Sequence, residues 1–227
     1  MNFGGDEVVY DYHESGIVVL PVPYDETSTW MKGADNGPSA IMEASVNLEF
    51  YDLETASEVH KKGIFTLEPL TEKSSPEALV FSVQKEIKRL LGEGKFPVVV
   101  GGNHTVSIGS VYAFAESYPG LTILQLDAHA DLRNFYEGSP LNHACVMARA
   151  REKASVVQVG IRSISAEEIP YADVTRIYPA HLLRYDKTLY RKALDSLGED
   201  VYVTIDLDVF DPSIMPSTGT PEPGGPD

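Results

Sequence analysis

The chain has 227 residues, with 18 Lys and Arg against 34 Asp and Glu, so its formal net charge at pH 7 is −16. This charge argues against binding to nucleic-acid phosphates and to anionic lipid surfaces. Hydrophobic residues make up 43% of the chain, which is enough for a folded core, and the single cysteine excludes an internal disulfide. No apolar run approaches the ~18 residues of a membrane helix. Together with an acidic N-terminus unlike a signal peptide, these features predict a cytoplasmic globular protein that binds neither nucleic acid nor membrane.

Short apolar segments alternate along the chain with amphipathic ones. Strands are expected over 17–20, 96–100, 121–126, 156–161 and 201–208; helices are expected over 38–49, 76–91 and 188–197, from about Thr105, and after a capping box of Ser165 and Glu168. The helix over 76–91 has the clearest boundaries, with Ser75 as its N-cap and Pro76 in its first turn. Alternating strands and helices predict a parallel sheet with helices on both faces. We expect a single α/β domain over residues 1–227, with a Pro-rich loop at its end.

Metal-ligand side chains follow three of the predicted strands. They are His104, then Asp127, His129 and Asp131, and finally Asp206 and Asp208. Because ligands bind beyond the carboxyl ends of parallel strands, we expect these six residues to meet in one crevice. Side chains two residues apart point the same way in an extended chain, so each segment presents its ligands on one face. By the same alternation, Val203 and Ile205 are expected to face the core.

Four carboxylates and two imidazoles in one crevice would repel one another unless cations neutralise them. Six ligands are too many for a single zinc site and suit two divalent cations bridged by carboxylate. The oxygen-rich set favours manganese over zinc. Taken one at a time, each segment also fits a solvated turn, a helix cap or a loop histidine. Their occurrence after three successive strands favours the metal site.

These motifs resemble those of the ureohydrolase family, which includes arginase and agmatinase. The matching stretches are residues 101–110, 127–150 and 204–225, and an early stretch over 21–45 resembles the agmatinase branch. The resemblance implies a three-layer α/β/α fold, a centre of two Mn²⁺ ions and a homo-oligomer, either a trimer or a hexamer. By position, it assigns one ion to His104, Asp127, Asp131 and Asp206, and the other to Asp127, His129, Asp206 and Asp208.

The resemblance also implies an activity on a small cationic guanidino substrate. A hydroxide shared by the two cations would attack agmatine and release putrescine and urea, with Asp127 in a catalytic role as a bridging ligand. Arginase, guanidinobutyrase, aminopropylagmatine hydrolase and formiminoglutamate hydrolase remain alternatives. His143 matches a family histidine proposed to move protons, and its unperturbed pKa suits that task, although it fits a packing role as well.

The resemblance fails at the end of the chain. Family members usually continue past the Gly-Thr-Pro-Glu-Pro-Gly-Gly stretch into a segment whose glutamate grips the guanidinium of the substrate. Glu222 lies within that stretch and is not this glutamate. We therefore expect the C-terminal segment of the family to be lacking here, which leaves a non-catalytic, truncated relative as a second hypothesis.

Overall fold

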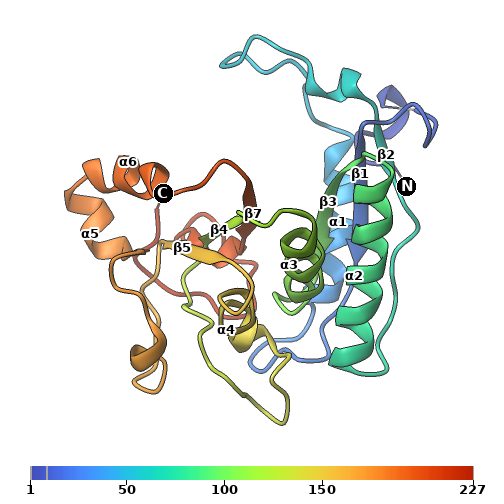
Figure 1. Cartoon of the computed structure of the whole chain (residues 1–227). Coiled ribbons are helices and arrows are strands. Elements are labelled where there is room, and N and C mark those ends of the chain that lie inside the picture. The colour runs from blue at the N-terminus through green and yellow to red at the C-terminus, as the bar shows by residue number, and fades with distance from the viewer. Residues whose placement is uncertain (1, 9, 227) are drawn as a thin grey trace.

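Two parallel sheets form the centre of the computed structural model, which describes residues 2–8 and 10–226 (Figure 1). The first sheet has the strand order β2-β1-β3 and the second has the order β6-β5-β4-β7. The strands are β1 (Ile17–Val22), β2 (Ile64–Thr66), β3 (Phe96–Gly101), β4 (Thr122–Leu126), β5 (Ser155–Val159), β6 (Ile177–Tyr178) and β7 (Val201–Ile205). The helices are α1 (Gly37–Ser45), α2 (Pro76–Gly92), α3 (Val106–Ser117), α4 (Val146–Ala150), α5 (Ala180–Tyr185) and α6 (Thr188–Asp195).

Helices cover both faces of the first sheet. Side chains of β1 alternate, so that Val18 and Leu20 pack against α2, where Leu79 is fully buried. Val19 points the other way and packs with Met42 of α1. This alternation explains why β1 reads as a continuous apolar run.

The second sheet is covered in the same manner. Ile123 of β4 packs with Met147 of α4, together with residues of α3, on one face. On the opposite face, Val157 of β5 packs with Leu183 of α5 and Ala193 of α6. The predicted three-layer α/β/α class with parallel strands is therefore confirmed.

The two sheets are separate, because among the described residues no strand pairing joins β3, at the edge of the first sheet, to β7, at the edge of the second. Helix α3 contacts both β3 and β7 and so connects the two halves of the fold. On β7, Val203 and Ile205 are 49% and 56% exposed, so the prediction that they face the core is wrong. Alternation along β7 instead turns Tyr202 and Thr204 toward α3, where Tyr202 packs 5.1 Å from the ring of Phe114.

The last predicted strand also ends earlier than expected. It stops at Ile205, and Asp208 lies in a 3-10 turn over Leu207–Val209. Four short elements, β2, β6, α4 and α5, were not predicted from the sequence because they have too few residues to show a periodic pattern. No helix within residues 2–8 and 10–226 is long and apolar enough to cross a membrane.

Candidate metal centre

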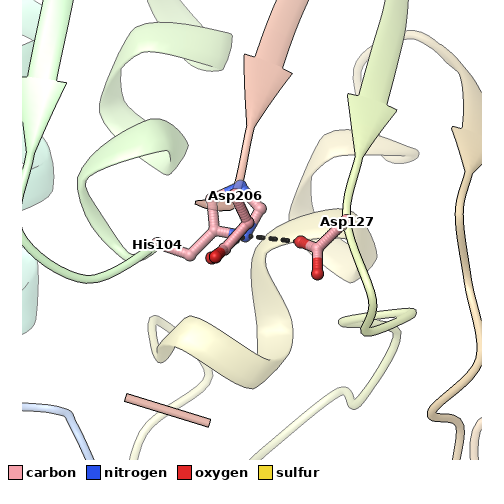
Figure 2. A group of neighbouring side chains, drawn as sticks. All are labelled: His104, Asp127 and Asp206. Atoms are coloured by element: carbon pink, nitrogen blue, oxygen red, sulfur yellow. Dashed lines mark ion pairs between the residues drawn. The ribbon is translucent and has the colours of Figure 1, made fainter. Parts of the chain in front are cut away.

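His104 lies in the loop that follows β3. This loop passes very close to the loop that follows β1. A Cβ atom on Gly102 would lie 2.0 Å from the carbonyl oxygen of Tyr24, so only glycine fits there. The backbone N–H of Asn103 donates to that same oxygen. His104 then points toward the ends of β4 and β7 (Figure 2). Its Nε2 atom lies 2.9 Å from Oγ1 of Thr204.

Asp127 is the first residue after β4, and both of its carboxylate oxygens are held. Oδ2 accepts a 2.7 Å hydrogen bond from the Gln125 amide, and Oδ1 accepts one of 2.7 Å from the backbone N–H of His129. The chain then turns through Asp131, whose φ of 53° lies in the left-handed region. The segment is therefore a tight loop and not an extended chain.

A second tight turn carries Asp206 and Asp208. The carboxylate of Asp206 accepts a hydrogen bond of 3.1 Å from the backbone N–H of Asp208 and so caps the 3-10 turn. The carboxylate of Asp208 accepts one of 3.2 Å from the N–H of Ala128. The two aspartates approach each other through this turn, and not through the strand alternation assumed from the sequence.

Asp127 is shared by two groups of potential ligands. Its Oδ2 lies 3.2 Å from Nδ1 of His104, and its Oδ1 lies 3.7 Å from Nδ1 of His129. One group joins Asp127 and His104 with Asp206, and the other joins Asp127 and His129 with Asp208; within each group the ligand atoms lie within 4.8 Å of one another.

Asp131 completes the cluster. Its Oδ2 atom lies 2.8 Å from Nδ1 of His104. In the second group, Oδ2 of Asp208 lies 3.0 Å from Nδ1 of His129. The structure therefore brings together all six side chains that the sequence singled out.

A profile of the arginase family matches residues 15–227 of the chain. The chain belongs to the arginase family. It is 38% identical to an N(1)-aminopropylagmatine ureohydrolase from Synechocystis, over 96% of this chain and 75% of that protein. It is 34% identical to an agmatinase from Pyrococcus horikoshii, over 95% of this chain and 76% of that protein. The structure of an agmatine ureohydrolase from Thermoplasma volcanium superposes with a TM-score of 0.90 at 30% identity, covering 99% of this chain and 77% of that one.

These similarities confirm the predicted family, fold and enzyme class. Arginase-family ureohydrolases are hydrolases that act on guanidino compounds. The chain spans about three quarters of the length of these relatives.

Burial and crowding make the cluster of this arginase-family chain a strong candidate for cation binding. Burial, together with the charges of Asp127 and Asp208, raises the pKa of Asp206 to about 8. Burial and the charge of Asp127 likewise raise the pKa of Asp131 to about 7, although His104 opposes the shift. When ionised, the four carboxylates, three of them buried and Asp206 partly buried, carry more negative charge than two histidines balance, and a pair of divalent cations would relieve that excess. Oxygen-rich ligands with some imidazole are a donor set that suits Mn²⁺.

Two buried glutamines, Gln125 and Gln158, make hydrogen bonds that support the loop after β4. Gln158 of β5 donates to the side-chain oxygen of Gln125 at 2.6 Å and to the carbonyl of Ala130 at 2.8 Å. Gln125 in turn donates to Asp127 and to the carbonyl of His129. Neither glutamine was predicted from the sequence to be part of the site. The signal was present, because an amide in the middle of an otherwise apolar strand needs a buried partner.

Glu168 supports the other end of the same loop. Its Oε1 accepts a 2.8 Å hydrogen bond from the backbone N–H of Leu132, and its Oε2 accepts one of 2.7 Å from the N–H of Ser165. The second bond is part of the capping box predicted from the sequence. The first extends that box to the loop that carries Asp131.

His143 lies outside both ligand groups, at the start of a 3-10 helix over His143–Cys145 that is capped by Asn142. Its Nδ1 atom is buried and has no hydrogen-bond partner in the described part of the chain. Burial, reinforced by the positive charges of His104 and His129, lowers its pKa to about 4. The imidazole is therefore neutral at pH 7, and the near-neutral pKa assumed from the sequence does not apply.

Proposed function

We propose that this chain binds two Mn²⁺ ions and hydrolyses agmatine to putrescine and urea. The observation that carries the proposal is the Asp127 carboxylate, which presents one oxygen to each histidine of the cluster. A carboxylate in that position is suited to bridge two cations. The agmatinase and agmatine ureohydrolase among the relatives, and the strong negative charge of the chain, support a cationic guanidino substrate.

The six clustered side chains would hold the ions. His104, Asp131 and Asp206 would bind one with Asp127, and His129 and Asp208 would bind the other. Such cations would supply a nucleophile, because a divalent cation lowers the pKa of the water that it binds. Gln125 and Thr204 would orient the inner ligands through the hydrogen bonds described above.

His143 would transfer the proton that the reaction requires. Hydrolysis adds the elements of water across the bond between the guanidinium carbon and the amine nitrogen, so the departing amine must gain a proton. A neutral imidazole with a free, buried Nδ1 can accept a proton when water is activated and pass it to that amine. His143 is thus proposed as the group that carries the proton.

Aminopropylagmatine is the second candidate substrate. Relatives described as N(1)-aminopropylagmatine ureohydrolases are 35–38% identical to this chain. This substrate has the same guanidino end as agmatine and a longer cationic tail, so the same centre would serve both. Arginine, guanidinobutyrate and formiminoglutamate each carry at least one carboxylate, so the acidic chain would attract them less strongly.

The experiment is a side-by-side assay of urea release with saturating Mn²⁺. Agmatine, aminopropylagmatine, arginine and guanidinobutyrate are compared by kcat/KM, with Asp127→Ala as the inactive control. We expect the two cationic-tailed substrates to exceed the others by at least 10-fold. Manganese binding without turnover of any guanidino compound would favour the non-catalytic alternative.

We also propose that the chain acts as one ureohydrolase unit within a cytoplasmic homo-oligomer. The family resemblance supports a trimer or a hexamer. Analytical ultracentrifugation of the purified protein tests that assembly directly, because the two masses differ by a factor of two.

A further inference from the structure

Glu222 lies on the side of His129 that faces away from the cluster. The Nδ1 atom of His129 lies 3.0 Å from Oδ2 of Asp208 and points into the cluster. The Nε2 atom lies 3.6 Å from Oε1 of Glu222, within ion-pair distance. The imidazole is therefore placed between a ligand carboxylate and an outer carboxylate.

The guanidinium of Arg162 holds the backbone of Glu222 in this place. Its Nε and one terminal nitrogen donate to the carbonyl oxygen of Glu222, at 3.2 and 2.7 Å. The remaining bonds of the guanidinium go to four further carbonyl oxygens, those of Gly160, Asp208, Val209 and Phe210. Arg162 makes no ion pair with a carboxylate within residues 2–8 and 10–226.

These bonds join three parts of the chain: the end of β5, the turn that carries Asp208, and the Pro-rich segment that carries Glu222. Five acceptors arranged around one planar donor group require arginine, because a lysine ammonium has three donors and no fixed plane. Arg162 therefore connects the Glu222 segment to the very turn that presents Asp208.

Further contacts fix the segment over that turn. The carboxylate of Asp211 accepts a 2.7 Å hydrogen bond from the N–H of Gly224, and the N–H of Asp211 donates to the carbonyl of Pro226 at 3.0 Å. A Cβ atom on Gly225 would lie 2.5 Å from the carbonyl oxygen of Val209, so the two backbones approach as closely as glycine allows. The position of Glu222 is thus set by backbone contacts and not by its partly buried side chain alone.

We propose that Glu222, held by Arg162, is a positioning residue for His129. An imidazole that offers Nδ1 to a cation carries its proton on Nε2, and a carboxylate that accepts this proton fixes the ring and its tautomer and strengthens the Nδ1 donor. The inference rests on the proposed function, because it assumes that a cation binds at Nδ1. Glu222, which lies between Pro221 and Pro223, would thus support the binding of one ion, the one held by Asp127, His129 and Asp208.

The test compares manganese titrations, followed by electron paramagnetic resonance of free and bound Mn²⁺, for the wild type and four variants. Glu222→Ala removes the acceptor, Glu222→Gln keeps an oxygen that accepts from Nε2, and Arg162→Lys keeps the charge but not the planar fork. Glu199→Gln, at an exposed site without an ion pair among the described residues, is the matched control.

We expect Glu222→Ala to weaken one of two manganese sites by ~10- to 100-fold and to leave the other unchanged. Glu222→Gln should regain most of the lost manganese affinity. The affinity of Arg162→Lys should lie between those of Glu222→Ala and the wild type. The metal-free melting temperature of Glu222→Ala should equal that of the control, which separates positioning from a general structural role.

Wild-type affinity at both sites in Glu222→Ala would overturn the inference and leave the proposed function standing. A higher KM for the guanidino substrate with both metal sites intact would also overturn it, because Glu222 would then contact substrate. Absence of manganese binding by the wild type would reject the proposed function itself, and the inference with it.

Discussion

The amide of Gln125 donates a 2.7 Å hydrogen bond to Oδ2 of Asp127, the carboxylate common to both ligand groups. The orientation of that amide is not free, because its oxygen already accepts from Gln158 at 2.6 Å. A relay of two buried amides thus runs from β5 through β4 to the centre of the cluster. It aligns Asp127 without adding another charge.

Replacing Gln125 by Met should therefore weaken metal binding while keeping the side-chain length. The change removes the Gln125 hydrogen bonds to Asp127 Oδ2, to the carbonyl of His129 and from the Gln158 amide, so we expect a loss of stability of about 1–3 kcal/mol. Manganese affinity should fall by ~10- to 100-fold. Calorimetric manganese titration and thermal melting measure both effects, with Gln84→Met on α2 as the control. Unchanged affinity in Gln125→Met would mean that the relay does not orient Asp127.

Removing the shared carboxylate should lower the number of bound manganese ions more than removing an unshared one. We expect Asp127→Ala to retain less than one manganese per chain, and Asp131→Ala to retain about one of two. Asp206→Ala should lose at least one ion. Elemental analysis after dialysis gives the stoichiometry, and circular dichroism confirms that each variant is folded. Equal losses from Asp127→Ala and Asp131→Ala would contradict a bridging role for Asp127.

His143→Ala should keep both metal ions but slow turnover. Proton transfer by a positioned side chain typically contributes ~10²–10⁴-fold, and we expect kcat to fall within that range. The measurement is urea release at saturating manganese, with metal content determined on the same samples. A variant with wild-type kcat would restrict His143 to a packing role.

The same residue should make folding stability depend on pH. Burial lowers the pKa of His143 from 6.5 to about 4, so between these values the unfolded chain binds the proton and the folded chain does not. The contribution of His143 to the free energy of unfolding is therefore fully present above pH 6.5 and is lost as the pH falls toward 4. At pH 5 the loss is roughly 2 kcal/mol. Urea unfolding of the metal-free wild type and of His143→Gln, at pH 7.5 and 5, isolates this contribution. Parallel pH dependences in the two proteins would show that the imidazole is not held neutral.

Substitutions in two parallel strands should distinguish the observed packing from the packing expected from the sequence. Val157 is 0% exposed and Val203 is 49% exposed, although both lie in apolar strands. Val157→Thr buries a hydroxyl and should cost about 1–3 kcal/mol, whereas Val203→Thr should change stability by less than ~0.5 kcal/mol. Chemical denaturation of the two variants gives the comparison, and equal costs would mean that the outer face of β7 is packed.

Sequence alone determined the elements whose patterns are local and long. The apolar run of β1 and the helix capped by Ser75 both appear as predicted, because capping, proline placement and apolar periodicity are properties of neighbouring residues. It also determined which six side chains form the cluster, because strand ends that carry ligands converge wherever strands are parallel.

Only the tertiary structure decided how those side chains meet and what supports them. Asp206 and Asp208 converge through a capped turn, and Arg162 gathers carbonyl oxygens from three segments that are far apart in the chain. Val203 is exposed because alternation along β7 turns Tyr202 and Thr204 toward α3 and Val203 to the opposite face. Such features depend on contacts between distant segments, whose partners no local pattern encodes, and so they become visible only in the folded chain.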